Sequence, residues 1–518
     1  MKLSEKKLER LQSRINSIID TARGMEVTYQ SELEKVHPAY KKSAHNLVHY
    51  MALRSHYIED LQQELRFMGL PGLSNCEGHV MRSLLAIKTI LNFLGGKPVN
   101  EKQKGTLSIK KSSKVMNANT RALFGNKGKK RRTRIMVTIP SVAAEDKQFI
   151  NRLISLGMNC ARINCAHDDQ ETWDRMITNI REVATTRHRQ CKVMMDLGGP
   201  KLRTGPMMPG PQVIHIKPEK DIMGRVTNPA MVWMAPQEFL PPGNAQAVHL
   251  PVDATWLGII KKGDEIFFTD SRGKKCSMQF LRRQKEGRWA ICTTSAYIST
   301  GTQFELKKQD ELGEHLYQLG ELPSIEQVIT LNTGDQLRIH KDTGLGEPAK
   351  YDESGNLIEL PHISCTLPEI FDDVKPGEPI LFDDGKIEGT IVGADHGELL
   401  VKITNAKETG SKLRADKGIN LPVSELSVTG LTKKDKEDLA FVVGHADAVN
   451  VSFVNDKEDV QQLLDKLREL TANPGIILKI ETRKGFNNLP NILLTAMQNY
   501  PVGVMIARGD LAIETGWK

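Results

Sequence analysis

The sequence predicts an α/β protein: a (β/α)₈-type barrel of the TIM class, interrupted by an inserted β-barrel lid and preceded by an α-helical region. Three observations lead to this fold class. Short apolar strands begin about every 30 residues, amphipathic stretches separate them, and more than 200 residues rich in Gly and Pro interrupt the series after its third strand. Apolar strands that alternate with amphipathic helices are typical of a parallel sheet covered on both faces.

Composition narrows the class of protein. The chain has 518 residues, 39% hydrophobic and 26% charged, with a formal net charge of +8, values that are ordinary for a globular protein of several domains. No apolar run reaches the length of a membrane span, so we expect no membrane partner. The seven cysteines are scattered without a CxxC pair, which favours a reducing, cytoplasmic location over a disulfide framework or a zinc site.

Changes in pattern along the chain suggest domain boundaries. The expected segments are an N-terminal helical region at 1–97, a basic linker at 98–132, the first part of the barrel at 133–204, the lid at 205–421 and the second part of the barrel at 422–518. The lid is expected to hold two β modules, at about 205–320 and 321–421.

The N-terminal region reads as amphipathic helices. Between Ser43 and Leu70, apolar residues recur at mostly three- or four-residue spacing and predict one long helical face: Leu47, Met51, Leu53, Tyr57, Leu61, Leu65 and Met68. Gly69 and the following Pro-Gly-Leu end that helix. A second amphipathic stretch runs from His79 to Leu94.

Two polar features of the first 134 residues admit a functional and a plain interpretation. His45, His49 and His56 fall roughly on a shared helical face and could bind a metal, but no carboxylate or cysteine completes the set, so ordinary histidines are favoured. The basic run from Gly125 to Arg134 could touch nucleic acid. A solvated linker is favoured, because no nucleic-acid-binding motif accompanies the run.

The inserted segment repeats itself. Residues 211–216 (PQVIHI) resemble 326–331 (EQVITL), and 261–270 (KKGDEIFFTD) resemble 375–384 (KPGEPILFDD), both at an offset of about 115 residues. Two matches at one offset are better evidence of a duplication than either alone. We therefore interpret the lid as a duplicated small β-barrel, with chance similarity between β-rich stretches as the alternative.

Charged and polar residues gather where the predicted strands end, and the C-terminal ends of the strands form the active-site face of a (β/α) barrel. Glu481 and Asp510 could converge as two carboxylates, a pair that suits Mg²⁺ or Mn²⁺ when water and substrate oxygens complete the ligands. The cations suit phosphate groups, so the combination favours phosphoryl transfer over a set of ordinary salt bridges. The residues at these ends are Arg162, Asn164, His167, Asp196, Lys201, Arg203, Lys479, Glu481, Arg508, Gly509 and Asp510.

These strand ends carry a family resemblance. Eight stretches resemble pyruvate kinase motifs in the order of that family: GMNCARINCAH, MMDLGGPKLRTG, FDDGKIEGTIVG, KGINLP, LTKKDKEDLAF, VNVSFV, ILKIE and GVMIARGDLAIE. They cover about 133–204 and 375–518. The resemblance implies transfer of a phosphoryl group from phosphoenolpyruvate to ADP, in glycolysis, by a (β/α) barrel with a mobile lid inserted after its third strand.

The resemblance also implies residue roles. Lys479 resembles the catalytic lysine that neutralises the phosphoryl group in flight and polarises the enolate. Glu481 and Asp510 resemble the Mg²⁺ ligands. Arg162, also catalytic, and Arg203 resemble the cations that hold phosphates, and Asn164 and His167 match positions beside the nucleotide. Asp384 and Lys417 match lid residues over the ADP or ATP phosphates. The backbone of Ala507, Arg508, Gly509 and Asp510 resembles the cradle for the substrate carboxylate.

One departure from the family pattern concerns potassium. Where many members carry a glutamate, a threonine and a serine that accompany K⁺, this chain has Lys201, Leu197 and Ala166, which resembles the K⁺-independent branch. Asn164 and Asp196 match the other positions of the former K⁺ site. A lysine ammonium is a compact monovalent charge, so Lys201 is expected to replace K⁺, and the enzyme to need Mg²⁺ (or Mn²⁺) but not K⁺.

Other departures leave alternatives open. The sequence reads TIPS after the first strand, Ala512 stands where glycine is usual, and six strands are counted before the chain reaches Lys518. The barrel is therefore expected to be incomplete at its C-terminal end and this chain to turn over poorly, while a full-length form could be a homo-oligomer. The alternatives are a non-catalytic nucleotide- or phosphoenolpyruvate-binding homologue and a metal-dependent pyruvate or oxaloacetate lyase, which the lid motif and Lys417 disfavour.

Overall fold

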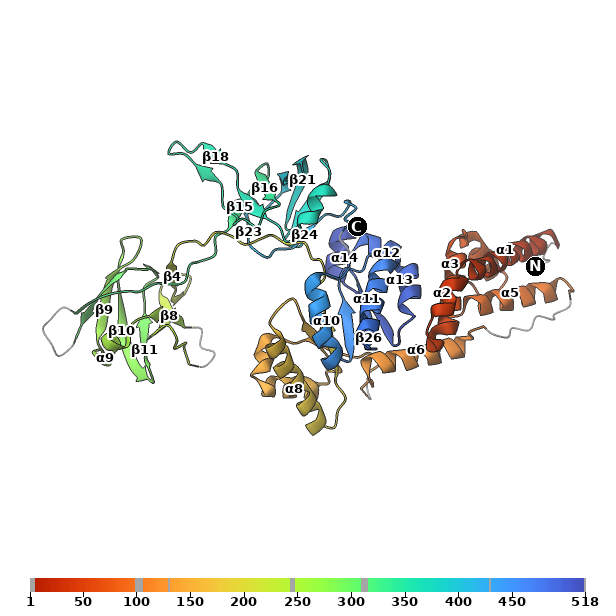
Figure 1. Cartoon of the computed structure of the whole chain (residues 1–518), viewed down its shortest axis with the longest axis horizontal. Coiled ribbons are helices and arrows are strands. Elements are labelled where there is room, and N and C mark those ends of the chain that lie inside the picture. Colours follow the sequence, from red (N-terminus) through yellow and green to blue (C-terminus); the bar gives the residue numbers. More distant parts are fainter. Residues whose placement is uncertain are drawn as a thin grey trace. The chain divides into compact units, whose positions relative to one another are not determined.

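The computed structural model describes residues 5–97, 106–128, 131–242, 247–308, 315–427 and 430–516 (Figure 1). Lys129 and Lys130 of the basic run lie outside the described residues. The chain divides into two compact units. The first unit comprises Met1–Arg203, Thr366–Leu399 and Gly418–Lys518, and the second comprises Thr204–Cys365 and Leu400–Lys417.

The first unit begins with a helical bundle: α1 (Glu5–Thr28), α2 (Gln30–Lys35), η1 (Pro38–Tyr40), α3 (Lys41–Arg54), α4 (Glu59–Phe67) and α5 (Val80–Leu94). Leu11, Ile15 and Ile18 of α1 are buried at helical spacing and share a core with α5. The long helix predicted over 43–70 is wrong, because the chain breaks between α3 and α4 and leaves Tyr57 70% exposed.

The three histidines predicted to share a helical face meet partners that the sequence pattern did not predict. Oε1 of Glu26, on α1, lies 2.7 Å from His45 Nδ1 and 2.8 Å from His49 Nε2, and His56 Nε2 lies 2.9 Å from Thr21 Oγ1. A carboxylate therefore does accompany His45 and His49. Among the described residues, however, no group of three or more His, Cys, Asp or Glu side chains is arranged to hold a metal ion.

Six parallel strands form the central sheet in the order β1 (Met136–Thr138), β2 (Cys160–Asn164), β3 (Lys192–Asp196), β25 (Ala448–Val451), β26 (Gly475–Ile480) and β27 (Val502–Ile506). They coincide with the six strands that the sequence predicts. The α/β class is thus confirmed, whereas the (β/α)₈-type barrel, incomplete at its C-terminal end, stays a prediction.

Helices connect these strands: η2 (Ser141–Ala144), α7 (Lys147–Leu156), α8 (Gln170–Thr186), α10 (Lys433–His445), α11 (Lys457–Glu469), α12 (Arg483–Asn487), α13 (Leu489–Ala496) and α14 (Arg508–Thr515). Local sequence fixes where several begin, since Asp146 and Asp169 cap α7 and α8, and capping boxes start α10 at Thr432 and α11 at Asp456. One sheet face packs against these helices, for example through Ala161 of β2.

The other sheet face is apolar at the amino ends of its strands, where helix α6 (Ile109–Phe124) covers it. Leu123 of α6 packs with residues from four strands: Cys160, Met194, Ala448 and Ile477. A Cβ at Gly475 or Gly503 would lie 2.7 or 2.5 Å from Leu123 side-chain atoms, so these glycines permit the close approach. Part of the expected linker at 98–132 is therefore a helix that contributes to the core.

The bundle also joins the edge of this sheet. The Tyr40 hydroxyl accepts a hydrogen bond from the Val502 N–H at 2.8 Å and lies 3.4 Å from the Val502 carbonyl. Leu33 and Val48 of the bundle share a buried cluster with Leu494 of α13. The N-terminal region and the central sheet are thus parts of one packed unit.

Three strands and a 3₁₀ helix of the inserted sequence also belong to the first unit: η3 (Pro368–Asp372), β20 (Pro379–Phe382), β21 (Ile387–Ala394) and β24 (Ile419–Asn420). The strand β22 (Glu398–Asn405) carries the chain across the boundary into the second unit. The two compact units divide the inserted sequence at other residues than the predicted lid limits. The predicted limits therefore stay predictions.

The second unit is mostly antiparallel β-structure. One sheet has the order β14 (His315–Gln318), β13 (Gln303–Lys307), β9 (Glu265–Thr269), β10 (Lys275–Gln284), β11 (Gly287–Cys292), β7 (Ala230–Ala235) and β8 (Val248–Pro251), with α9 (Ala254–Gly258) after β8. Smaller pairs are β4 (Val213–Ile216) with β12 (Ala296–Ser299), β5 (Glu219–Lys220) with β6 (Val226–Asn228), β15 (Ile329–Leu331) with β23 (Ser411–Leu413) and β17 (Lys350–Tyr351) with β18 (Leu357–Glu359). At the edge of a further sheet, β16 (Gln336–His340) pairs in parallel with β19 (His362–Ser364). Both members of each predicted repeat form strands, β4 with β15 and β9 with β20.

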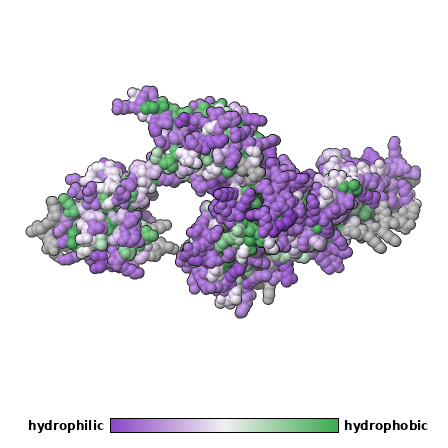
Figure 2. All heavy atoms as spheres, in the orientation of Figure 1, coloured by the Kyte–Doolittle hydropathy of each residue, from purple (hydrophilic) through white to green (hydrophobic). Residues whose placement is uncertain are grey.

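Hydrophilic residues cover most of the surface drawn in Figure 2. Among the described residues, no helix combines the length and the apolar character needed to cross a bilayer.

Replacing Leu123 by alanine is expected to destabilise the first unit by about 2–5 kcal/mol, because it opens a cavity among four strands. The free energy of unfolding from urea titration measures this. Leu156→Ala is the matched control, since Leu156 is 81% exposed at the end of α7 and should change stability by less than about 0.5 kcal/mol. Equal effects of the two substitutions would contradict the packing role of α6.

Candidate active site

Asp196 is the centre of a buried polar cluster at the carboxyl ends of the strands. Parallel pairing sets Asn164 and Asn450 directly beside it on the neighbouring strands. The Asp196 side chain is 1% exposed, and its Oδ2 accepts two hydrogen bonds from Arg162, from Nε at 2.9 Å and from the second guanidinium nitrogen at 2.6 Å. Hydrogen bonds between two charged groups are stronger than those between neutral groups, and the bonds to Asp196 raise the pKa of Arg162.

Lys479 enters the same cluster from β26 and is 8% exposed. Its Nζ donates to Ser452 Oγ at 2.8 Å, and it lies 2.9 Å from Glu481 Oε1 and 3.5 Å from Asp196 Oδ2. Two carboxylates and a hydroxyl therefore fix the ammonium. A charge this deep in the protein is tolerated because it is paired and hydrogen-bonded.

Sequence reasoning missed two members of the cluster, Asn450 and Ser452. Asn450 is fully buried, and its Nδ2 donates to Asp196 Oδ1 at 2.5 Å, while its own Oδ1 has no hydrogen-bond partner. Ser452 Oγ donates to the Leu197 carbonyl at 2.8 Å. Two polar residues at alternate positions of a strand that is otherwise apolar would have identified them, because alternate residues face the same side.

Glu481 and Asp510 are each paired with a lysine. Glu481 is 3% exposed, and its Oε2 accepts a hydrogen bond from the Phe453 N–H at 2.7 Å. Asp510, in the first turn of α14, lies 3.3 Å from Lys201 Nζ. Each carboxylate therefore already holds one positive charge. Two carboxylates fit Mg²⁺ or Mn²⁺, which keep water or substrate oxygens as their further ligands, better than they fit zinc.

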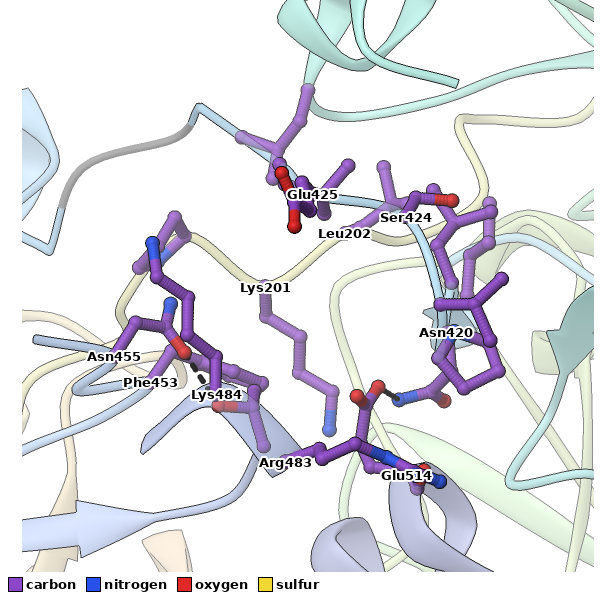
Figure 3. Close-up of a pocket in the computed structure, with 18 of the residues that line it drawn as sticks. Lys201, Leu202, Asn420, Ser424, Glu425, Phe453, Asn455, Arg483, Lys484 and Glu514 are labelled. Carbon is purple, nitrogen blue, oxygen red and sulfur yellow. Dashed lines mark hydrogen bonds between the residues drawn. The ribbon is translucent and has the colours of Figure 1, made fainter. Parts of the chain in front are cut away.

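Lys201 points into a cavity of about 650 Å³ (Figure 3). The cavity is also lined by Arg483 and Lys484 and by the acidic residues Glu425 and Glu514. Burial raises the pKa of the Glu514 carboxyl, whose Oε1 accepts a hydrogen bond from Asn420 at 3.3 Å. Lys201 is therefore the counter-ion of Asp510, whereas Arg162 and Lys479 are the counter-ions of Asp196.

The remaining residues predicted around the strand ends have mostly local contacts. Asn164 Oδ1 accepts from the Ala166 N–H at 3.2 Å, and the His167 carbonyl accepts from Trp173 Nε1 at 2.8 Å. The Arg203 N–H donates to Thr366 Oγ1 at 2.9 Å. These contacts hold the backbone near the carboxyl ends of the strands.

The other predicted site residues are backbone positions or belong to the inserted sequence. At the start of α14, Ala507 and Arg508 precede Gly509, where an added Cβ would meet no atom within 4 Å. Asp384 is exposed in the turn between β20 and β21, at a φ of 59°. Lys417 belongs to the second unit, where its N–H donates to Thr204 Oγ1 at 2.8 Å.

The fold and the site together define an α/β protein whose parallel strands end in two buried carboxylates, Asp196 and Glu481, paired with Arg162 and Lys479. A further pair, Lys201 with Asp510, is partly exposed. The amino-acid sequence is similar to those of known proteins. A family model described as the barrel domain of pyruvate kinase matches residues 130–270 and 319–518, more than half of the chain. The chain belongs to the pyruvate kinase family.

Curated relatives agree with this assignment over part of their length. The pyruvate kinases of Staphylococcus aureus strains USA300 and NCTC 8325 / PS 47 are each 33% identical to this chain over 190 residues. That alignment covers 36% of this chain and 29% of each relative. The chain therefore matches less than a third of the length of these proteins.

Replacing Asp196 by asparagine is expected to lower the free energy of unfolding by about 3–5 kcal/mol, because Arg162 and Lys479 would lose their shared buried counter-ion. Urea titration at neutral pH measures the change. Asp465→Asn is the matched control, since Asp465 is 55% exposed in a surface pair with Arg468 and should cost less than about 1 kcal/mol. A small loss for Asp196→Asn would mean that the cluster does not depend on this carboxylate.

Proposed function

We propose that this protein transfers the phosphoryl group of phosphoenolpyruvate to ADP and so gives pyruvate and ATP in glycolysis. The observation that carries the proposal is the position of Lys479, a buried ammonium held between Asp196 and Glu481 at the end of a parallel strand. Membership of the pyruvate kinase family supports the same reaction.

Lys479 would act on the charge that moves during transfer. Its ammonium is already desolvated and held by Ser452 and Glu481, so little reorganisation is needed when negative charge develops on the phosphoryl group and on the enolate oxygen. Such preorganised charge is the main contribution that a protein makes to phosphoryl transfer. Lys479 would therefore contribute more to the turnover rate than to substrate affinity.

Other cations and backbone groups would bind and orient the substrates. Arg162 and Arg203 would hold phosphate oxygens, and the backbone from Ala507 to Asp510 would receive the carboxylate of phosphoenolpyruvate. On the nucleotide side, Asn164, His167, Asp384 and Lys417 would contact ADP or ATP. These assignments follow the family resemblance.

Glu481 and Asp510 would hold a divalent cation, Mg²⁺ or Mn²⁺. When bound, this ion supplies positive charge against the phosphate oxygens. The protein's own part is to present two carboxylates, one of them nearly inaccessible to water, beside Lys479.

The proposal is tested by coupling pyruvate formation from phosphoenolpyruvate and ADP to a dehydrogenase, with Mg²⁺ or Mn²⁺ present. Pyruvate that appears in proportion to ADP supports transfer. Binding of phosphoenolpyruvate or nucleotide without pyruvate formation would instead favour a non-catalytic homologue. Pyruvate released from oxaloacetate without ADP would favour a lyase.

Lys479→Ala is expected to lower turnover by roughly a hundredfold or more, as loss of a preorganised charge donor does in other enzymes. Nucleotide binding should be largely retained, and the two quantities are measured by the coupled assay and by calorimetry on the form of the protein that turns over. Lys466→Ala is the control, because Lys466 forms a surface pair with Glu469. Near-normal turnover of Lys479→Ala would refute the assignment.

Potassium is expected to have little effect on the rate, because Lys201 supplies a built-in cation and Ala166 offers no hydroxyl ligand. The test compares activity in tetramethylammonium buffer with and without KCl at matched ionic strength. Lys201→Glu should lower activity, and combining it with Ala166→Ser in KCl should recover part of the loss. A strong rise of the wild-type rate with K⁺ would contradict the prediction.

A further inference from the structure

The ion pair between Lys201 and Asp510 occupies a carboxylate that the proposed function assigns to the metal. Their Nζ and Oδ1 atoms are 3.3 Å apart, and the two side chains are 30% and 27% exposed. We propose that Lys201 is a displaceable counter-ion of Asp510: a divalent cation gains this carboxylate only by releasing the lysine ammonium into the neighbouring cavity. The inference rests on the proposed function in one respect, that Asp510 is a metal ligand.

The charges of the cluster balance before any metal enters. Two carboxylates, Asp196 and Glu481, are paired with two cations, Arg162 and Lys479, and Asp510 is paired with Lys201. A divalent cation adds two positive charges to this balanced set. Because like charges in a partly buried site repel more strongly than in water, one resident cation must move away.

Lys201 is the resident cation that yields most readily. Arg162 holds Asp196 through two hydrogen bonds, and the Lys479 ammonium has three partners and a side chain 10% exposed. The Lys201 ammonium has one hydrogen bond, to Asp510, and a side chain three times as exposed. Its release therefore breaks the fewest interactions.

The structure also provides room for the displaced ammonium. Lys201 lines the cavity of about 650 Å³ together with Glu425 and Glu514 (Figure 3), and its Nζ lies 5.9 Å from the centre of the Phe453 ring. The Lys201 backbone stays fixed, since its N–H donates to the Gly199 carbonyl at 2.8 Å and its carbonyl accepts from Thr366 Oγ1 at 3.1 Å. A rotation of the side chain is therefore enough.

This arrangement couples the metal to an anionic substrate. Metal alone is opposed by the loss of the Lys201–Asp510 pair, whereas a phosphate group that arrives with the metal offers the displaced ammonium a new partner. Coupling of this kind is reciprocal, so the anion tightens the metal as much as the metal tightens the anion. Lys201 thereby disfavours metal binding in the absence of substrate.

The test measures Mn²⁺ binding to the protein alone, by the loss of the free Mn²⁺ signal in electron paramagnetic resonance. Lys201→Met should tighten Mn²⁺ binding by about threefold to tenfold, the range for one partly exposed ion pair. Lys201→Arg keeps the charge and should bind Mn²⁺ about as the wild type does. If Lys201→Met does not fold, as judged by circular dichroism, Lys201→Gln takes its place with the same expectation.

Lys484→Met is the matched control. Lys484 lines the same cavity but pairs with Asp456, at 3.2 Å, so its substitution removes the same charge without freeing Asp510 and should change Mn²⁺ affinity by less than about twofold. Unchanged or weaker binding in Lys201→Met, equal gains in the two variants, or no Mn²⁺ binding by any of them would overturn the inference. A Lys201-specific gain in a protein that forms no pyruvate would support it, although the proposed turnover would then fail.

Discussion

The Asp196 carboxylate is the interaction on which the rest of the site depends. With 1% of its surface exposed, it would be costly to bury without partners, and three strands supply them: Arg162 from β2, Asn450 from β25 and Lys479 from β26. The positions of the catalytic candidates are thereby tied to the pairing register of the sheet. A one-residue slip in that register would turn these side chains to the opposite face.

On the same face of the sheet, apolar residues pack next to this charged cluster. On this face, β2 changes from Cys160 at its amino end to Arg162 and then Asn164, and β3 changes from Met194 to Asp196 at its carboxyl end. Leu123 closes the apolar end from outside the sheet, and Gly475 and Gly503 leave the space that it fills. Packing at one end and ion pairing at the other hold one set of strands, which explains why a segment expected to be a linker is part of the core.

The sequence predicted the six strands and the gathering of charge at their ends because both depend on short patterns: apolar runs, turns and the residue after each run. It could not assign partners. The role of Lys201 in place of K⁺ stays a prediction, whereas its ion pair with Asp510 joins residues 309 positions apart, a contact that no local pattern encodes. Glu26 likewise reaches His45 and His49 from another helix.

Asn450 is a second residue whose partner the sequence pattern could not assign. Its neighbours in the chain are apolar, and an amide inside such a strand can be read as a tolerated polar residue. Its importance emerges only when Asp196 lies beside it, because its Nδ2 then satisfies the one Asp196 oxygen that neither Arg162 nor Lys479 contacts. With both oxygens occupied, Asp196 is held too firmly to exchange partners, so a change of charge in the site has to be absorbed by the looser pair of Lys201 and Asp510.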